Sequence, residues 1–495
     1  MKEKKAVIIG SGIAGLATAI RLACMGMKVT VFEKNSKPGG KLTGFSEQGY
    51  KFDAGPSLFT QPENIETLFS IAEEPIEDYF TYTTLSNTCK YFYENGKIIN
   101  GFADRDKFAA EIEEQTGEEG QKIKKYLSRS HDLYTNIGTL FLERPVRNTL
   151  FTSYVFKALR SLRFTYLFSS LASFNKRQFK TTEVRQIFNR YATYNGSNPY
   201  KAPAMLSLIP HLEHNQGTFF PRDGMSSITN ALYRLAVKKG VIFLFNQQVE
   251  RIIHTESKVL GVVVDNNNIP ADIVVSNADV YFTFRNLLNQ PQRAAGLLKQ
   301  ELSSSAIVFY WGINKTYLQL ELHNIFFSND YEKEFNCLFN DKVLYDDPTL
   351  YINITSKLEP SHAPQGCENW FVMINVPPDS GQDWEAIRIK AKSLVIAKIN
   401  RVLGTNVEDH IVFENHMDPL QIQEKTGSFK GAIYGASSNS RFSTFLRPSN
   451  KYSLFKGLYF CGGTVHPGGG IPLCLKSACI TANLVSTDLK NYHHA

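Results

Sequence analysis

The sequence is poor in cysteine and in long apolar runs, and each shortage excludes a class of protein. Its seven cysteines among 495 residues form no metal motif, since the closest pair, Cys474 and Cys479, lacks a zinc spacing. We expect reduced thiols in the cytoplasm. No uncharged apolar run reaches the roughly 18 residues of a membrane-spanning helix. Hydrophobic residues make up 43% of the chain, which favours a globular protein of two or more domains.

The N-terminus has two features of a secretory signal. Met1–Lys5 is basic, and an apolar run follows it. That run contains Gly10, Gly12 and Gly15, however, and a second apolar stretch with an acidic end comes directly after it. We therefore interpret these residues as the start of the fold and expect no cleaved signal.

The glycine turn after the first apolar run has the pattern of a dinucleotide-binding site. Ala6–Ile9 predicts a buried strand, and the pattern after the turn predicts a helix to about Met25. The first glycine permits the tight turn, the second lets a pyrophosphate approach the backbone, and the third lets helix and strand pack closely. The helix N-terminus offers free N–H groups to the phosphates. The predicted contacts are Gly10, Ser11, Gly12, Ile13, Ala14 and Gly15.

An acidic residue ends the second predicted strand. Lys28–Phe32 is that strand, and Glu33 lies 18 residues after Gly15, where a carboxylate can accept hydrogen bonds from ribose hydroxyls. A carboxylate there disfavours a 2′-phosphate and therefore NADP. We expect Glu33 and the adjacent Lys34 to contact the cofactor.

The next glycine-rich stretches resemble a flavoprotein extension of this motif. Pro38–Leu42 and Gly49–Ser57 match the pattern shared by amine oxidases, protoporphyrinogen oxidases and carotenoid desaturases. Ordinary glycine turns are the alternative. The resemblance implies FAD rather than NAD, with contacts from Gly40, Lys41, Leu42, Gly55, Pro56 and Ser57.

The C-terminal end of the sequence resembles the flavin-contacting segment of the carotenoid desaturases. Gly457–Gly463 predicts a strand that runs into a glycine turn, and His466–Pro472 opens a helical pattern to about Leu489. A helix N-terminus there can face the part of the flavin that becomes negative on reduction. Two middle segments also fit the nucleotide domain, Val241–Ile252 and Ala271–Asp279. The contacts expected from these parts are Val249, Asn277, Asp279, Gly462, Gly463, Gly470, Ile471 and Pro472.

Taken together, these motifs resemble the bacterial phytoene desaturase family over essentially the whole chain, with a leaning toward 1-hydroxycarotenoid 3,4-desaturases. The resemblance implies an FAD-dependent desaturase that passes a hydride from a carotenoid to flavin N5. No nucleophile–base or metal arrangement is evident in the sequence, in agreement with cofactor-borne chemistry. A flavin-dependent carotenoid isomerase, an amine oxidase and a prenyl-binding carrier without flavin stay open as alternatives.

Few residues qualify as a protein base. Asp223 is the first candidate, because it stands where the desaturase segment matched by Gly217–Met225 usually has glycine. Its alternative is a turn carboxylate paired with Arg222. His211 and His214 could share a helical face, but two histidines make a poor metal site, and we expect no metal. We expect His466 to be a structural neighbour of the flavin loop and Lys476 to be a solvated charge.

The predicted architecture is α/β: a discontinuous FAD-binding Rossmann-like domain, of the two-dinucleotide-binding-domain flavoprotein type, with a discontinuous α+β substrate domain. The strand-like runs Ser305–Gly312 and Trp370–Val376 belong to the latter. A sheet facing an apolar tunnel would suit a rod-like carotenoid. The expected ranges are 1–90, 215–285 and 430–495 for the FAD domain, and 90–140, 180–215 and 285–430 for the substrate domain.

Residues 141–180 form the third predicted unit, a helical membrane-facing segment. Between Arg144 and Lys180 the chain has eight basic residues, eight aromatic residues and no Asp or Glu. The eight positive charges of this stretch exceed the net charge of the whole chain, which is +7. Such a mixture suits an anionic lipid surface. A nucleic acid is the rival partner and is disfavoured. An ordinary helical subdomain with aromatic core residues is the other alternative. The pattern predicts a peripheral membrane protein; it does not indicate an oligomeric state.

The phosphate-turn assignment predicts the effect of one substitution. Gly12→Val should abolish FAD binding, because the added side chain would occupy the space of the pyrophosphate. The flavin absorbance of the purified variant, measured after its circular dichroism shows a folded protein, checks this. A folded variant with one flavin per chain would refute the assignment.

Overall fold

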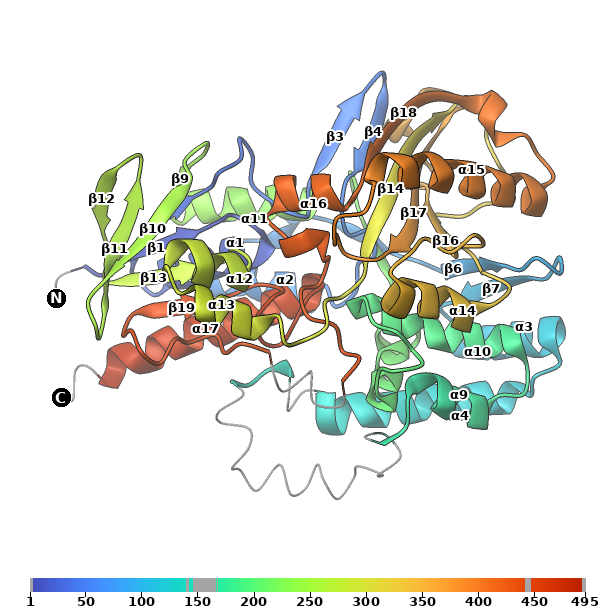
Figure 1. Cartoon of the computed structure of the whole chain (residues 1–495), viewed down its shortest axis with the longest axis horizontal. Coiled ribbons are helices and arrows are strands. Elements are labelled where there is room, and N and C mark those ends of the chain that lie inside the picture. The colour runs from blue at the N-terminus through green and yellow to red at the C-terminus, as the bar shows by residue number, and fades with distance from the viewer. Residues whose placement is uncertain (1–2, 139–141, 146–165, 167, 441–446, 492–495) are drawn as a thin grey trace.

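The computed structural model describes residues 3–138, 142–145, 166, 168–440 and 447–491, and one half of the molecule is built on a parallel sheet (Figure 1). The five strands have the order β19–β13–β1–β2–β9, and each pairs in parallel with its neighbours. They come from three separate stretches of the chain: β1 (Lys5–Ile9), β2 (Lys28–Phe32), β9 (Ile242–Leu244), β13 (Ile273–Ser276) and β19 (Leu458–Phe460).

Both faces of this sheet are covered, which explains why its strands are apolar at nearly every position. Successive residues of β1 alternate between two cores, with Ala6 and Ile8 in one and Val7 and Ile9 in the other. The first core contains the helices α1 (Ile13–Cys24), α2 (Glu63–Ile71), α11 (Ser226–Lys238) and α17 (Ile471–Asn491). The second contains an antiparallel sheet and two short helices: β10 (Val249–His254), β11 (Val259–Val264), β12 (Asn267–Pro270), α12 (Val280–Phe282) and α13 (Pro291–Leu297).

The other half, called the second domain below, is built on a seven-stranded sheet of order β18–β14–β17–β16–β15–β6–β7 (Figure 1). The long central pair is antiparallel over nine residues, and the whole of β14 is buried. The two strand-like runs expected for this domain are therefore neighbours. The strands are β6 (Asn87–Phe92), β7 (Ile98–Phe102), β14 (Ser305–Ile313), β15 (His323–Phe326), β16 (Leu350–Asn353), β17 (Glu368–Val376) and β18 (Ile411–Met417).

The long helix α15 (Trp384–Leu403) packs on one face of this sheet, and the hairpin of β3 (Gly44–Glu47) and β4 (Tyr50–Asp53) packs on the other. The hairpin carries the glycine-rich extension of the nucleotide motif, so it joins the two domains. A further pair, β5 (Tyr82–Thr84) with β8 (Phe219–Pro221), is antiparallel.

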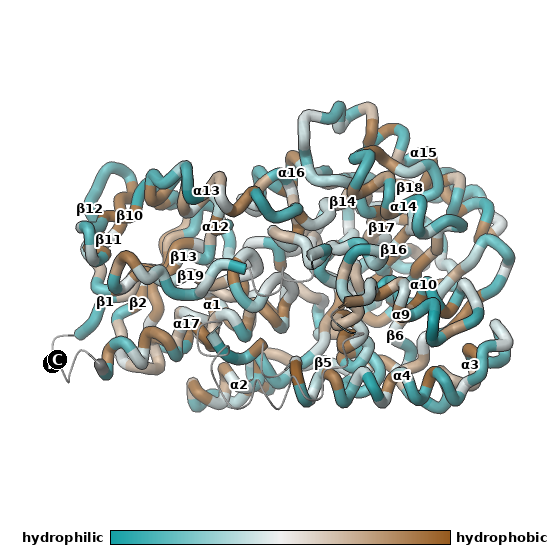
Figure 2. Tube along the Cα trace, turned by 60° about the horizontal axis from the view of Figure 1, so that its bottom comes forward, coloured by the Kyte–Doolittle hydropathy of each residue, from teal (hydrophilic) through white to brown (hydrophobic). Residues whose placement is uncertain are grey.

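A layer of helices covers the far end of the second domain. Their residues alternate between hydrophobic and hydrophilic along the chain, as α4 shows in Figure 2, and the hydrophobic ones form a separate core. The Asp104 side chain caps the N-terminus of α3, and Gly117 ends that helix in the left-handed conformation, with φ of 73°. The helices are α3 (Arg105–Thr116), α4 (Gly120–Leu133), α9 (Leu171–Gln178), α10 (Thr182–Asn189) and α14 (Tyr331–Asn336); α16 (Pro419–Thr426) lies near the hairpin end of the second sheet.

The basic aromatic segment is only partly described. Its middle, residues 146–165 and 167, lies outside the described residues. At its C-terminal end three of the aromatic rings, those of Tyr166, Phe174 and Phe179, are buried in the core of the helical layer. The expectation that these rings meet lipid was wrong, because Phe174 and Phe179 pack against Tyr126 of α4, Phe179 also packs against Phe188 of α10, and Tyr166 packs against Phe174. The alternative of aromatic core residues holds for these three.

The contact between hairpin and sheet predicts a packing defect. A Cβ added at Gly312 of β14 would lie 2.5–2.8 Å from the ring of Tyr50, which is itself buried. Gly312→Ala should therefore lower the free energy of unfolding by about 1–3 kcal/mol, as measured by urea denaturation. Gly296→Ala is the matched control, since nothing lies within 4 Å of the added Cβ in α13. Equal stability of the two variants would contradict this packing.

Candidate functional site

Two glycine turns from opposite ends of the chain meet at the side chain of Asn277. A Cβ added at Gly12 would lie 2.7 Å from the Asn277 carboxamide oxygen, and one at Gly15 would lie 2.9 Å from it. On the other side, the Asn277 amide donates to the Cys461 carbonyl at 3.2 Å, and a Cβ at Gly462 would lie 2.6 Å from its nitrogen. The three glycines are thus required by the protein's own packing, beyond any need of a ligand.

The first turn leaves the start of α1 open to an anion. Gly10 has φ of 92°, and Gly12 occupies the cap position of a helix that none of the described side chains caps. Ser11 is fixed by Glu33, whose buried carboxylate accepts from the Ser11 N–H and hydroxyl, both at 2.8 Å. Glu33 therefore shapes the phosphate turn directly; its contact with a ribose stays a prediction. Lys34 is exposed and donates to the Glu424 carbonyl at 2.8 Å.

The flavoprotein extension lies directly on this turn. The N–H of Gly39 donates to the Ser11 carbonyl at 2.9 Å, and a Cβ at Gly40 would lie 3.3 Å from the Gly12 Cα. A Cβ at Gly55 would lie 1.7 Å from the Lys41 carbonyl oxygen, so the two glycine-rich stretches pack without room for side chains. The rest of the extension is anchored nearby, since Leu42 is buried in the first core of the nucleotide domain.

Lys41 and Asp279 interact electrostatically at this junction. The Lys41 ammonium donates to the Ile433 carbonyl at 2.5 Å. Burial lowers the pKa of Lys41, while the Asp279 carboxylate acts in the opposite direction. Burial raises the pKa of Asp279, against the effect of hydrogen bonds from the N–H groups of Tyr281 and Phe429. Asp279 thus caps α12 and also partly balances Lys41.

The C-terminal turn has an open side. Gly463 and Gly469 are in contact, since a Cβ on the former would lie 3.1 Å from the Cα of the latter, and the Tyr434 ring lies against Gly469. Gly470 has φ of 102° and nothing within 4 Å of its added Cβ. It precedes Ile471, the first residue of α17. The helix therefore begins beside open space, as the flavin assignment expects. Contacts of Gly470, Ile471 and Pro472 with the cofactor stay predictions.

Sequence reasoning missed Arg447, which lies behind the same turn. It is buried, and its guanidinium donates to the carbonyls of Ala436 at 2.8 Å, Gly463 at 2.9 Å and Tyr434 at 3.2 Å. Burial lowers the pKa of Arg447 to about 10. Arg447 lies in a loop without hydrophobic periodicity, so the only feature that marks it in the sequence is the proline that follows it, Pro448.

A hydrogen-bonded chain links the extension to the second sheet. The Ser57 hydroxyl lies 2.7 Å from that of Tyr351, which lies 2.8 Å from Nδ1 of His323. The Asn353 amide donates to the Leu322 carbonyl at 3.0 Å and also faces that Nδ1, at 3.1 Å. Burial lowers the pKa of His323 to about 3, so the ring is neutral. Because the Asn353 amide nitrogen can only donate, Nδ1 is the acceptor. Tyr351 then donates to His323, and Ser57 donates to Tyr351.

Asp223 lies on an exposed turn with φ of 65°. Its carbonyl accepts from the Lys51 ammonium at 2.8 Å. The buried carboxylate in this region is instead Asp53, which accepts from the N–H groups of Met225 at 2.8 Å and Ser226 at 3.0 Å. The structure places Asp223 on an exposed turn, as the alternative expected; its pairing with Arg222 and its role as proton acceptor both stay predictions.

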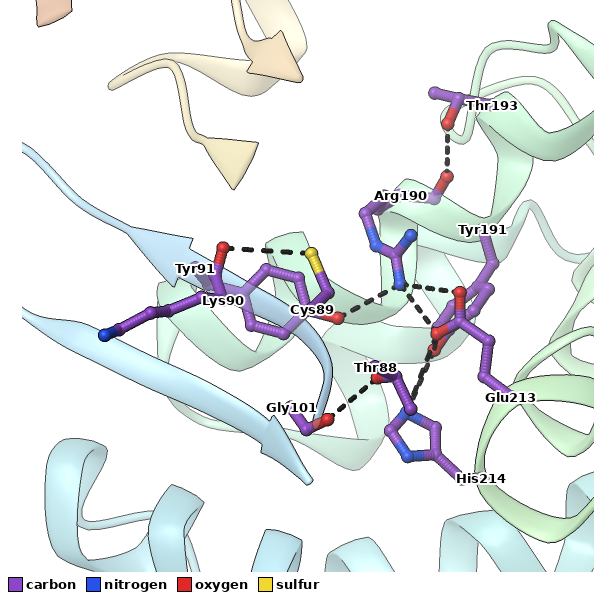
Figure 3. Close-up of polar contacts among 10 residues, drawn as sticks. All are labelled: Thr88, Cys89, Lys90, Tyr91, Gly101, Arg190, Tyr191, Thr193, Glu213 and His214. Carbon is purple, nitrogen blue, oxygen red and sulfur yellow. Dashed lines mark hydrogen bonds and ion pairs between the residues drawn. The ribbon is translucent and has the colours of Figure 1, made fainter. Parts of the chain in front are cut away.

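His214 belongs to a buried polar cluster in the second domain (Figure 3). Arg190 and Glu213 form an ion pair at 2.9 Å, and the Tyr191 hydroxyl donates to Glu213 at 2.6 Å. Nε2 of His214 lies 3.1 Å from that hydroxyl. Burial lowers the pKa of His214 to about 4, so it stays neutral. Among the described residues, no group of three or more His, Cys, Asp or Glu side chains could hold a metal ion.

The expectation of a solvated Lys476 was wrong. The side chain is buried and forms an ion pair with Glu143 at 3.0 Å. Its ammonium also lies 3.3 Å from the hydroxyl of Tyr134 in the second domain. His466 is buried as well, and its Nε2 lies 2.9 Å from the Arg144 carbonyl oxygen. The α17 side of the flavin loop is thus covered by the other domain.

The residues at this junction fit a bound FAD. The uncapped start of α1 suits the pyrophosphate, and Gly470 leaves open space at the start of α17. Lys41 and Arg447 supply positive charge near the two turns. Val249 begins β10 and is buried in the second core of the nucleotide domain; its contact with the cofactor and that of Pro56 stay predictions. The sequence and the geometry therefore indicate the same group.

Comparisons with known proteins agree with this geometry. The model of the family described as flavin containing amine oxidoreductase matches residues 13–486. The chain is 48% identical to a 1-hydroxycarotenoid 3,4-desaturase of Flavobacterium sp. strain P99-3, over 97% of this chain and 99% of that protein. It is 31% identical to a 4,4'-diaponeurosporene oxygenase of Staphylococcus haemolyticus, over 98% of each chain.

The fold has a solved counterpart. An oxidoreductase from Methanosarcina mazei superposes with a TM-score of 0.65 at 17% identity, covering 98% of this chain and 100% of that one. With this fold, the two glycine turns and the family match over nearly its whole length, the chain belongs to the flavin-containing amine oxidoreductases and is an FAD-dependent oxidoreductase.

Proposed function

We propose that the protein is a carotenoid desaturase that introduces a 3,4 double bond into a 1-hydroxylated carotenoid. The 48% identity to a 1-hydroxycarotenoid 3,4-desaturase, over nearly the full length of both chains, carries the proposal. The intact phosphate turn and the Glu33 contacts support a flavin enzyme over a prenyl-binding carrier.

The chemistry needs little from protein side chains. When bound, FAD supplies the hydride acceptor. The polyene delocalises the positive charge that remains after the hydride leaves, and a proton is then lost from the adjacent carbon. The chain's own contribution is to hold the cofactor between the two glycine turns. It also supplies an apolar cluster beside Ala54, in which Phe45, Phe52 and Tyr310 pack on one another and Tyr310 also contacts Phe371.

The two alternative enzyme activities differ from desaturation in the product that is formed or in how the flavin is attached to the protein. An isomerase would use reduced flavin without net oxidation. Amine oxidases usually attach their flavin through a cysteine near the C-terminus. Here Cys461 is buried, and burial raises its pKa to about 12, which makes it a poor nucleophile. The 48% identity to a 1-hydroxycarotenoid 3,4-desaturase favours desaturation over both alternatives.

A substrate panel tests the proposal. Purified protein with FAD should convert a 1-hydroxylated acyclic carotenoid in liposomes to a product with two fewer hydrogens, identified by mass and by its longer conjugated system. It should act on the non-hydroxylated and monocyclic counterparts at least about tenfold more slowly, a difference of about 1.4 kcal/mol in transition-state binding. Equal rates on all three would refute the substrate assignment, and a product of unchanged mass would favour the isomerase.

The same substrate implies a membrane surface, and we propose that the basic aromatic segment provides it. A carotenoid has almost no aqueous concentration, so it must enter the protein from a bilayer. None of the helices that the structure describes is long and apolar enough to cross one. Lys176, Arg177 and Lys180 are exposed at the C-terminal end of the segment, as is Phe168. Its other cations except Arg144 fall outside the described residues.

Replacing Arg160, Arg163, Lys176 and Arg177 with Gln should weaken binding to anionic liposomes by up to about 4 kcal/mol, at about 1 kcal/mol for each charge. Added salt should weaken the parent protein's binding as well. Sedimentation with liposomes measures both, with the flavin spectrum as a check of the fold. The matched control replaces four exposed cations elsewhere, Lys238, Arg251, Lys258 and Lys299. If both variants bind as the parent does, the segment is not the docking surface.

A further inference from the structure

Arg447 differs from the other buried cations of this protein. Apart from Lys41, which the Asp279 carboxylate partly balances, the described residues include four buried Lys or Arg side chains, and three of these have a carboxylate partner. Arg190 pairs with Glu213, Lys398 with Asp347 and Lys476 with Glu143. Such pairing is the rule for buried charges, because desolvation of an isolated charge is costly.

Arg447, in contrast, has only neutral partners among the described residues. Its three hydrogen bonds go to backbone carbonyls, and no ion pair includes it. All Asp and Glu residues of the sequence lie in the described ranges. The nearby Cys474 thiol does not supply a negative charge, because burial raises its pKa to about 11. The guanidinium thus keeps a positive charge that the protein does not neutralise.

The position of this charge is specific. A Cβ added at Gly468 would lie 3.2 Å from both Cζ and Nε of Arg447, so the guanidinium lies directly against the glycine loop. The same guanidinium binds the Gly463 carbonyl at the other end of that loop. The loop leads into α17, whose N-terminus adds partial positive charge of its own. An uncompensated cation therefore lies behind the segment assigned to the flavin.

We propose that Arg447 is a positioning residue that stabilises the negative charge of reduced flavin. A hydride brings two electrons and one proton to an oxidised flavin, so the reduced flavin carries one extra negative charge. A cation held in a water-poor site lowers the free energy of that form without reorganising. The inference rests on the FAD site and is independent of the carotenoid assigned as substrate.

Sulfite provides a test that does not depend on turnover. It adds to oxidised flavin and leaves the same kind of negative charge on the ring. Arg447→Gln should weaken sulfite binding to the holoprotein by roughly tenfold or more, given the strength of a charge interaction near a protein interior. The two-electron midpoint potential should fall by about 30 mV for each tenfold change. Arg447→Lys keeps the charge and should stay within about threefold of the parent.

Asn450 offers a matched control, because it holds the same loop without a charge. Its amide donates to the His466 carbonyl and the Ser477 hydroxyl, both at 2.9 Å. Asn450→Ala should lower thermal stability but leave sulfite affinity and potential near the parent values. If it weakens sulfite binding as much as Arg447→Gln does, the loop's shape and not the charge is responsible, and the proposal is overturned.

Two further outcomes keep the test decisive. Parent-like sulfite affinity in Arg447→Gln would overturn the proposal outright. If Arg447→Gln does not fold, Arg447→Lys decides between a charge role and a structural role. A purely structural role predicts a roughly tenfold loss of sulfite affinity in Arg447→Lys, because lysine cannot form the forked contacts of arginine. Absence of FAD from the parent protein would instead refute the cofactor site itself, and loss of activity on the hydroxylated carotenoid with normal sulfite binding would concern only the substrate.

Discussion

The close approach of two glycine turns to Asn277 is the contact on which the rest of this structure depends. The Asn277 side chain fills the space between Gly12 and Gly15 on one side and Gly462 on the other. Because the carboxamide hydrogen-bonds the Cys461 carbonyl, the last parallel strand and the first are held in register beside β13. Residues more than 440 positions apart in the sequence thereby form one site.

The charges around the site follow from this arrangement. The glycine turns before α1 and α17 meet at Asn277, so two positive helix ends would be available to one anionic cofactor. Glu33 binds Ser11 of the turn, whereas the Asp279 carboxylate partly balances the charge of Lys41. Arg447 remains without a carboxylate. The protein thus balances most of its buried charges within itself and leaves a positive excess where a reduced flavin would be negative.

The sequence predicted the parts of the site whose chemistry is local. Gly10 to Gly15 could be recognised because strand, turn and helix follow in order, and the resemblance to the desaturases was confirmed by a relative 48% identical over 97% of the chain. Arg447 could not be recognised, since its loop has no periodicity. Lys476 was misjudged because its burial depends on Tyr134, 342 residues away. The rings of Phe174 and Phe179 suggested lipid contact, but their packing against α4 and α10 decided otherwise.

The central claim is that the cofactor held between these turns takes the hydrogens of the substrate. An anaerobic single-turnover experiment tests it most directly: the FAD-loaded protein is mixed with a 1-hydroxylated carotenoid in liposomes, and flavin and polyene absorbance are followed together. The account predicts loss of the oxidised-flavin spectrum at the same rate as the conjugated system lengthens, with one double bond formed for each flavin reduced. A new double bond that appears while the flavin stays oxidised would contradict it.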